Sequence, residues 1–300
     1  PEKILLGSLA GSGTLGLLIP PSIILIIYGV AVQESIAKLF IAGIIPGIMI
    51  ALIFMSYVII WSLINKKEMP RILEEYSFLE KIKRSKQLLP VILLISAVIG
   101  SIYTGVATAT EAASLGVVGA LILSYFQKSL TLETFKSSLL GATKTSCMIA
   151  FILAGSTFLS LAMGFTGLPR NLAIWIQGME LSPYVLILVL MIFYIILGMF
   201  LDGISAVVLT MAIIEPMIRQ AGFDMIWFGI FLVIVVEMAQ ITPPVGFNLF
   251  VLQGMANKDM GDIARSAFPL FLLMVLAVIL VVIFPEIALW MPEQMVKNLN

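Results

Sequence analysis

Histidine is absent from the 300 residues, cysteine occurs once, and charged residues are scarce. Without imidazole, the sequence cannot build a histidine proton relay, a histidine-containing catalytic triad or a histidine zinc site. The single Cys147 excludes disulfides within this sequence and cysteine-rich metal sites. Charged side chains make up 11% of the residues, against about a quarter in ordinary globular domains. Seventeen basic and seventeen acidic residues cancel, so nothing indicates a nucleic-acid partner.

Hydrophobic residues make up 61% of the chain, and its mean hydropathy is +1.13. The runs at 36–64, 88–102, 184–200 and 267–284 lack charge or carry one at an end. Each run approaches the ~20 residues that cross ~30 Å of hydrocarbon. The sequence therefore predicts an all-α polytopic membrane protein. It begins with Pro1, and no signal-peptide pattern precedes the first apolar run.

The longest polar interval, "NKKEMPRILEEYSFLEKIKRSK" at 65–86, is rich in lysine and arginine. Basic residues in short loops mark the cytoplasmic side, so we predict a cytoplasmic linker over 65–87. Its apolar residues recur at helical spacing, which fits an amphipathic helix on the membrane surface or, equally, a solvated helical linker. The segment 127–144, with three lysines, is predicted to be cytoplasmic as well.

The stretch "FTGLPRN" at 165–171 separates two apolar segments that are short for full membrane spans. We predict a re-entrant hairpin over about 146–179 with its tip at 167–169. Two ordinary short helices are the alternative. Arg170 at the tip would face the membrane interface or, alternatively, an anionic substrate.

Double prolines interrupt two apolar helices, in "GTLGLLIPPSIILIIYG" at 13–29 and "EMAQITPPVGFNLF" at 237–250. An offset of 223 residues places Pro20-Pro21 on Pro243-Pro244 and also places Pro46 on Pro269. Breaks at corresponding positions of two repeats are typical of inverted-repeat secondary transporters, with the binding site between the breaks.

The repeat predicts the organisation of the chain. Residues 1–64 form the remainder of a first repeat, with a broken helix and the transmembrane helix after it. Residues 88–300 form a complete second repeat with scaffold helices, the hairpin, a broken helix over about 224–256 and a last helix over about 263–290. Because residues 88–223 have no upstream counterpart, we expect more than a hundred N-terminal residues of the first repeat to be missing.

A helix break exposes groups that bind ions. Proline lacks an N–H and ends the upstream half-helix, whose free carbonyls suit a small cation, while the N–H groups of the downstream half suit an anion. Two breaks can therefore hold Na⁺ and a carboxylate side by side. Ser12 and Gln240 supply further neutral oxygens at the breaks, and the predicted substrate-binding residues are Thr14, Ser22, Thr242 and Asn248. Plain helix kinks are the alternative.

Four acidic residues lie in or beside apolar segments, where charge is costly and usually functional: Glu111, Asp202, Glu215 and Glu237. Asp202, beside Gly203 and Ser205, is the best candidate for an ion ligand, and capping of the next helix is its alternative role. Glu111 is predicted to be a first-turn acid of the helix that follows it. Glu215, before Pro216, is expected near the end of a short helix.

Four stretches together resemble the large membrane subunit (DctM, or M, subunit) of tripartite ATP-independent periplasmic (TRAP) transporters. They are "GTLGLLIPPSIILIIYG", "GVATATEAASLG", "LGMFLDGISAVVLT" and "ITPPVGFNLFV", in the order of the family and spread over nearly the whole chain. The resemblance implies a Na⁺-coupled, elevator-type symporter of the bacterial inner membrane with no cofactor besides the coupling ion. It also implies a small four-helix membrane subunit, a periplasmic substrate-binding protein, and C4-dicarboxylate or sialic-acid-like substrates.

The resemblance also implies two sodium sites. The first would use backbone around Gly16, Leu18 and Pro20, with further ligands from a segment upstream of Pro1, and is incomplete in this chain if that segment is missing. The second would use Asp202, Ser205, Met238, Ile241 and Pro243. The chain departs from the family pattern at Ala109, Ala239 and Glu215, and the methyl group of Ala239 would crowd the second site.

Functions of other classes remain alternatives. An intramembrane aspartyl protease or lipid-modifying transferase needs paired acids or clustered ligands, and Asp202 has no second aspartate within an apolar span. A passive channel is disfavoured because nothing resembles a repeated selectivity filter.

Overall fold

The computed structural model describes residues 1–68, 88–167, 182–256 and 258–299, together with isolated residues between these ranges. Most of the predicted linker, Arg170 and the end of the predicted hairpin tip lie outside the described residues. Within the described ranges every regular element is a helix, and five helices are long and apolar enough to span a membrane. The bent pair formed by the first two helices would make a sixth span. The prediction of an all-α polytopic membrane protein is confirmed.

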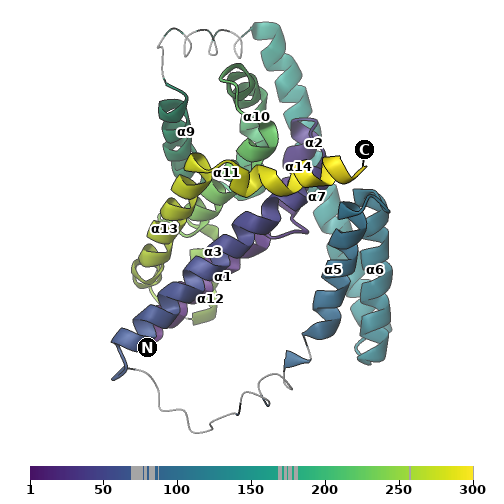
Figure 1. Ribbon diagram of the computed structural model, residues 1–300, viewed down its shortest axis with the longest axis vertical. Helices are drawn as coiled ribbons and strands as arrows, with labels where there is room; N and C mark the ends of the chain where they lie inside the picture. Colours follow the sequence, from purple (N-terminus) through teal and green to yellow (C-terminus); the bar gives the residue numbers. More distant parts are fainter. Residues whose placement is uncertain are drawn as a thin grey trace. The chain divides into compact units, whose positions relative to one another are not determined.

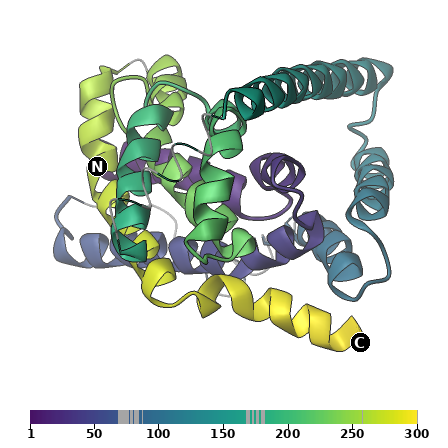
Figure 2. The same cartoon turned by 90° about the horizontal axis from the view of Figure 1, so that it is seen from above.

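The chain divides into two compact units, of which the larger comprises Pro1–Met69 and Ile152–Gln294. Its helices, shown in Figures 1 and 2, are α1 (Glu2–Leu18), α2 (Ile23–Ala31), α3 (Ile36–Ile64), α9 (Pro183–Gly198), α10 (Gly203–Gln220), α11 (Met225–Gln240), α12 (Phe247–Ala256) and α13 (Met260–Ile283). All sixteen residues of α11 are buried, and this helix contacts each of the other seven. The larger unit is therefore built around α11.

The smaller unit contains α5 (Leu89–Tyr103) and α6 (Ala109–Phe126), which pack against each other as an antiparallel pair. Thr108 and Glu111 form a capping box at the start of α6, with the Thr108 N–H 2.8 Å from Glu111 Oε2 and the Glu111 N–H 3.3 Å from Thr108 Oγ1. Such a box satisfies two N–H groups that a helix start leaves without partners. The predicted role of Glu111 as a first-turn acid is confirmed.

Two helices cross the division between the units, α7 (Leu132–Thr166) and α14 (Glu286–Leu299). The 35 residues of α7 form one continuous helix, about 52 Å long at the usual rise per residue. The first arm of the predicted hairpin is the second half of this helix, and the chain turns at Gly167 with φ +69°. The hairpin and its alternative both stay predictions.

The two broken helices have closely matching bounds. Glu2 and Met225, which begin α1 and α11, are separated by the offset of 223 residues, and each broken helix is followed by a long helix with an internal proline, Pro46 in α3 and Pro269 in α13. The predicted broken helix at 224–256 corresponds to α11 and α12. The predicted last helix at 263–290 falls on α13 and the start of α14, which Pro285 separates because proline cannot continue the hydrogen-bond ladder.

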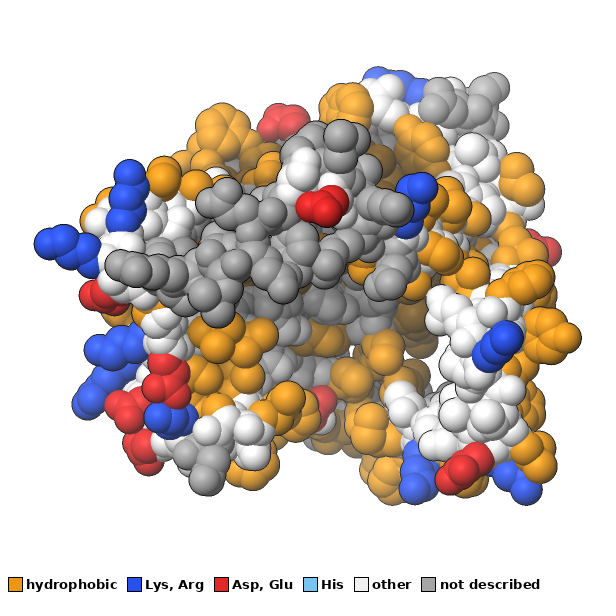
Figure 3. Space-filling model, turned by 90° about the horizontal axis from the view of Figure 1, so that it is seen from below, with side chains coloured by type: hydrophobic (Ala, Val, Ile, Leu, Met, Phe, Trp, Pro, Cys, Tyr) orange, Lys and Arg blue, Asp and Glu red, His pale blue; other side chains and the backbone are white. Residues whose placement is uncertain are grey.

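Large apolar side chains cover much of the surface, and Figure 3 shows them on the face seen from below. Ile64 in α3 is 75% exposed, and Phe165 in α7 is 92% exposed. In water such surfaces would associate or aggregate, so they fit a protein surrounded by lipid or by partner helices.

Candidate functional site

The first break separates α1 from α2, which are bent by 43° to each other. Because Pro20 and Pro21 have no N–H, the carbonyls of Gly16 and Leu17 lack their usual helical donors. The Ser22 hydroxyl donates to the Leu17 carbonyl and also caps α2 by accepting from the Leu25 N–H. The Gly16 carbonyl receives no such bond among the described contacts. The break therefore leaves the Gly16 carbonyl without its helical donor, and its role in ion binding stays a prediction.

The second break separates α11 from α12, and its double proline is cis, as is the first. Thr242 closes the end of α11: its hydroxyl donates to the Met238 carbonyl at 2.7 Å, and its N–H to the Ala239 carbonyl at 3.1 Å. The Gln240 carbonyl lacks the usual helical donor four residues on, because Pro244 has no N–H. At Gly246, with φ +45°, a Cβ would lie 2.8 Å from the Thr242 carbonyl oxygen, so glycine is required for this close approach.

The two broken helices run in opposite directions, and α13 shows this. Gly7 near the start of α1 packs on Ser266, whereas the indole N–H of Trp227 near the start of α11 donates to the Val281 carbonyl at 2.9 Å. These contacts are fifteen residues apart along α13, about 22 Å of helix. The side chain of Glu237, near the end of α11, lies beside the backbone of Leu18 at the end of α1. The two breaks therefore meet between the oppositely placed N-termini.

Each downstream half-helix packs on the opposite broken helix. Tyr28 in α2 lies against Gly229 and donates to the Met225 carbonyl at 2.6 Å. The Asn248 amide in α12 lies 3.6 Å from the position that a Cβ on Gly13 of α1 would take. This crossed packing brings polar groups of both breaks to the centre of the larger unit.

Asp202 lies at the N-terminus of α10 and caps it. Its Oδ2 accepts from the Ile204 and Ser205 N–H groups at 3.1 and 3.2 Å, and its Oδ1 accepts from the Ser205 hydroxyl at 2.5 Å. The next residue, Gly203, touches Gln240 of α11, since a Cβ there would lie 3.1 Å from Gln240 Nε2. The structure therefore places the Asp202–Ser205 pair next to the end of α11.

Three buried polar atoms in this region make no hydrogen bond by distance and angle. Both carboxyl oxygens of Glu237 and the Nδ2 atom of Asn248 are buried without a partner. Glu237 is 0% exposed, as is Thr14, whose hydroxyl donates to the Gly11 carbonyl at 2.8 Å. Buried polar groups in folded proteins are nearly always satisfied by protein, ordered water or a bound ion, so these atoms mark the region between the breaks as the candidate site.

The donor set fits a hard cation held mainly by neutral oxygens. Within the described ranges, no three His, Cys, Asp or Glu side chains come close enough to hold a metal ion together. A cation here would depend on backbone carbonyls and hydroxyls with a single carboxylate. The predicted substrate residues Thr14, Ser22, Thr242 and Asn248 all lie at the two breaks.

The sequence places the methyl group of Ala239 at the second sodium site, whereas the structure packs it against another helix. Its Cβ is buried against α9, and a Cβ built on Gly198 would lie only 2.6 Å from it. The methyl group therefore fills the space that Gly198 leaves.

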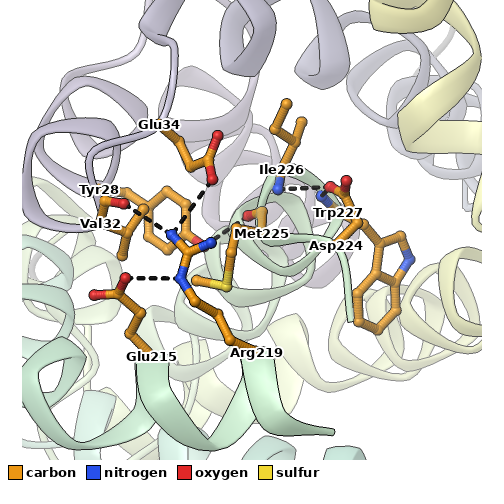
Figure 4. A network of polar contacts seen from close by, with 9 residues as sticks. All are labelled: Tyr28, Val32, Glu34, Glu215, Arg219, Asp224, Met225, Ile226 and Trp227. Carbon is orange, nitrogen blue, oxygen red and sulfur yellow. Dashed lines mark hydrogen bonds and ion pairs between the residues drawn. The ribbon is translucent and has the colours of Figure 1, made fainter. Parts of the chain in front are cut away.

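Sequence reasoning missed a polar cluster at the C-terminal end of α10 (Figure 4). Arg219 joins α10 to the turn between α2 and α3: its guanidinium donates to Glu215 at 2.9 Å, to the Val32 carbonyl at 3.1 Å and to Glu34 at 3.4 Å. The spacing of four residues between Glu215 and Arg219 was the one local signal available. The contact with the distant turn had none.

Comparisons with known proteins agree with this architecture. A family model described as the DctM component of the tripartite ATP-independent periplasmic transporter matches residues 1–287. The C4-dicarboxylate TRAP transporter large permease protein DctM of Pseudomonas aeruginosa is 32% identical over 98% of this chain and 68% of its own length.

Other relatives carry different names. The sialic acid TRAP transporter large permease protein SiaM of Vibrio cholerae is 31% identical over 96% of this chain and 67% of its own length. The isethionate TRAP transporter permease protein DctMQ of Oleidesulfovibrio alaskensis is 31% identical over 94% of this chain and 44% of its own length. These relatives are transporter permeases and not enzymes, which removes the intramembrane-enzyme alternative. The chain belongs to the DctM family of TRAP transporter large permeases.

Proposed function

We propose that this chain is the membrane permease of a Na⁺-coupled secondary transporter that imports organic acids. The proposal rests on one observation: two oppositely directed broken helices meet at their breaks in the centre of the larger unit. This arrangement offers carbonyl ends to a cation and N–H ends to an anion at the same depth.

The substrate side would be formed by the starts of α2 and α12. Ser22 lies at the first of these starts, Thr242 just before the second, and Asn248 within its first turn. The unpartnered N–H of Asn248 is a donor without an acceptor, which suits a carboxylate oxygen. Relatives are named for C4-dicarboxylate, sialic acid, 2,3-diketo-L-gulonate and isethionate. The first three are carboxylates and isethionate is a sulfonate, so a small organic-acid anion, most simply a carboxylate, is the substrate class that we infer.

The cation side would use the backbone of Gly16, Leu18 and Pro20 at the first break. At the second it would use Asp202 and Ser205 with the backbone of Met238, Ile241 and Pro243. A bound sodium ion would supply positive charge beside the substrate carboxylate, which lowers the cost of placing that carboxylate away from water. Reciprocity then requires the substrate to tighten Na⁺ binding by the same factor.

The proposed assembly follows the family to which the chain belongs. A small four-helix membrane subunit would hold the permease in the bacterial inner membrane, and a periplasmic binding protein would deliver the substrate. A permease fused to such a subunit fits the name DctMQ of one relative. Elevator-type movement of the larger unit is part of the same proposal.

Uptake into proteoliposomes tests the proposal. The permease is reconstituted with the small subunit and the binding protein, and labelled C4-dicarboxylate or sialic acid is added with and without an inward Na⁺ gradient. We expect uptake that requires both the gradient and the binding protein. Uptake of an organic acid without Na⁺ would overturn the coupling, and no uptake of any organic acid would overturn the substrate class.

A further inference from the structure

An apolar groove lies between α3 and α13, the two long helices that follow the breaks, and has a volume of about 600 Å³. It is lined by Ile45, Leu52 and Ile60 of α3 and by Leu273 and Leu280 of α13. From Ile45 to Ile60 the groove extends about 22 Å at the usual rise per residue. The hydrocarbon of a bilayer is ~30 Å thick, so the groove is long enough to follow an acyl chain through one leaflet.

The groove is too narrow for a helix. A volume of about 600 Å³ over about 22 Å gives a mean cross-section of about 27 Å². A helix with its side chains is about 10 Å across, which corresponds to roughly 80 Å². A chain of methylene groups therefore fits the groove better than a helix of a protein partner does.

A second hollow, of about 470 Å³, adjoins the groove at Tyr57, which lines both. The start of α1, the end of α3 and the first turns of α13 meet there, and its lining includes Lys3, Trp61, Glu68 and Arg265. We call this hollow the polar mouth. Tyrosine, tryptophan and basic side chains are typical of the level at which hydrocarbon meets lipid headgroups. The groove therefore opens at one end into a charged hollow at the membrane interface.

The polar mouth holds hydrogen-bond donors without acceptors. Within the described ranges, the side chains of Lys3, Tyr57 and Trp61 form no hydrogen bond and no ion pair. Arg265 forms an ion pair with Asp262 at 3.7 Å, which is too long for a direct hydrogen bond. A ligand with several acceptor oxygens would satisfy these donors together.

The acidic residues of the mouth leave its basic residues available. Glu2 pairs with Lys258 at 2.9 Å, so it does not compete for Lys3. Glu68 lines the mouth and forms no ion pair within the described part of the chain. The mouth therefore offers cations to an anion and one carboxylate to a cation, which matches the phosphate and ammonium groups of a zwitterionic headgroup.

We propose that the larger unit binds one zwitterionic phospholipid, with an acyl chain in the groove between α3 and α13 and its headgroup in the polar mouth. The phosphate lies at Lys3 and Arg265, and the ammonium group lies at Glu68. Because α3 and α13 are the matching helices of the two repeats, the lipid joins the repeats at the membrane-facing surface. The inference does not depend on the proposed sodium coupling.

Photo-crosslinking of the reconstituted permease tests the inference. Benzoylphenylalanine replaces Leu52 in the groove or, as the matched control, Ile196 of α9; these side chains are 53% and 54% exposed. The vesicles contain equal amounts of phosphatidylethanolamine and phosphatidylglycerol, and mass spectrometry identifies the adducts. We expect mainly phosphatidylethanolamine adducts at position 52, reduced about tenfold when Lys3→Gln and Arg265→Gln are combined. Adducts at position 196 should follow the vesicle composition and stay unchanged in that double variant.

Three results would overturn the inference: adducts at position 52 that follow the vesicle composition, adducts that persist in the folded double variant, or adducts to a protein segment instead of a lipid. If the double variant does not fold, Ser56→Phe keeps the test decisive, because its ring would fill the groove. Native mass spectrometry of the detergent-purified permease should show bound phosphatidylethanolamine, which Ser56→Phe loses. Met55→Phe, one residue along α3 and outside the groove lining, is the matched control and should keep it. Equal retention by the two variants would also contradict the proposal.

Discussion

At the scale of single residues, glycines at close backbone and side-chain contacts shape the site as much as its polar side chains do. Gly246 leaves room for the Thr242 carbonyl, and Gly198 leaves room for the methyl group of Ala239. The sequence identified both breaks, because proline acts through covalent structure. It could not show where the Ala239 methyl group points, since that depends on a helix forty residues away in the chain.

The Gly198–Ala239 contact can be tested by exchanging the methyl group between helices. Gly198→Ala places two Cβ atoms 2.6 Å apart, so we expect a loss of about 1–3 kcal/mol in stability from overpacking. Adding Ala239→Gly should restore most of the loss. Thermal unfolding of the single and double variants measures both effects. Gly254→Ala in α12, where a new Cβ meets nothing within 4 Å, is the matched control. A Gly198→Ala protein as stable as the control would contradict the packing of α9 on α11.

At the scale of elements, local signals fixed the helix ends better than the partners of each helix. Prolines marked the ends of α1 and α11 and the boundary before α14. The N-caps at Ser22, Thr108 and Asp202 also follow from residue type. The sequence could not show that α2 packs on α11 and α12 on α1, because long apolar faces without periodic polar residues do not specify a partner.

Arg219 joins two elements and allows a prediction at this scale. Its side chain is 46% exposed, so its ion pairs with Glu34 and Glu215 should contribute at most about 1 kcal/mol. We expect Arg219→Gln to lower the unfolding midpoint slightly, and by less at high salt, because salt screens exposed ion pairs. Hydrogen exchange of the turn at 32–35 should rise in the variant. Arg219→Lys keeps the charge and tests the bond to the Val32 carbonyl. Unchanged exchange in Arg219→Gln would show that the cluster does not hold the turn.

At the scale of the whole molecule, the repeat in the prolines predicted an inverted arrangement, and the contacts along α13 show α1 and α11 starting at opposite ends of that helix. The repeat could not predict the buried carboxylate of Glu237, because the corresponding residue of the first repeat is Thr14. At this position the two repeats differ in the side chain, while the bounds of their broken helices match closely.

Crossed packing of the half-helices is testable by disulfide formation. In a Cys147→Ser background, cysteines at Gly13 and Asn248 should form a disulfide on mild oxidation, since the Asn248 Cγ atom, close to where the sulfur of a cysteine at that position would lie, is 3.9 Å from a Cβ on Gly13. A small rotation of the two side chains would bring them to disulfide geometry. Phe250 provides the control: it is 61% exposed, and two residues along a helix turn its side chain about 200° away from that of Asn248. Mass spectrometry of the linked peptides measures the yield. Equal linking of Gly13 to positions 248 and 250 would mean that α12 does not hold one face against α1, and the meeting of the two breaks would lose its support.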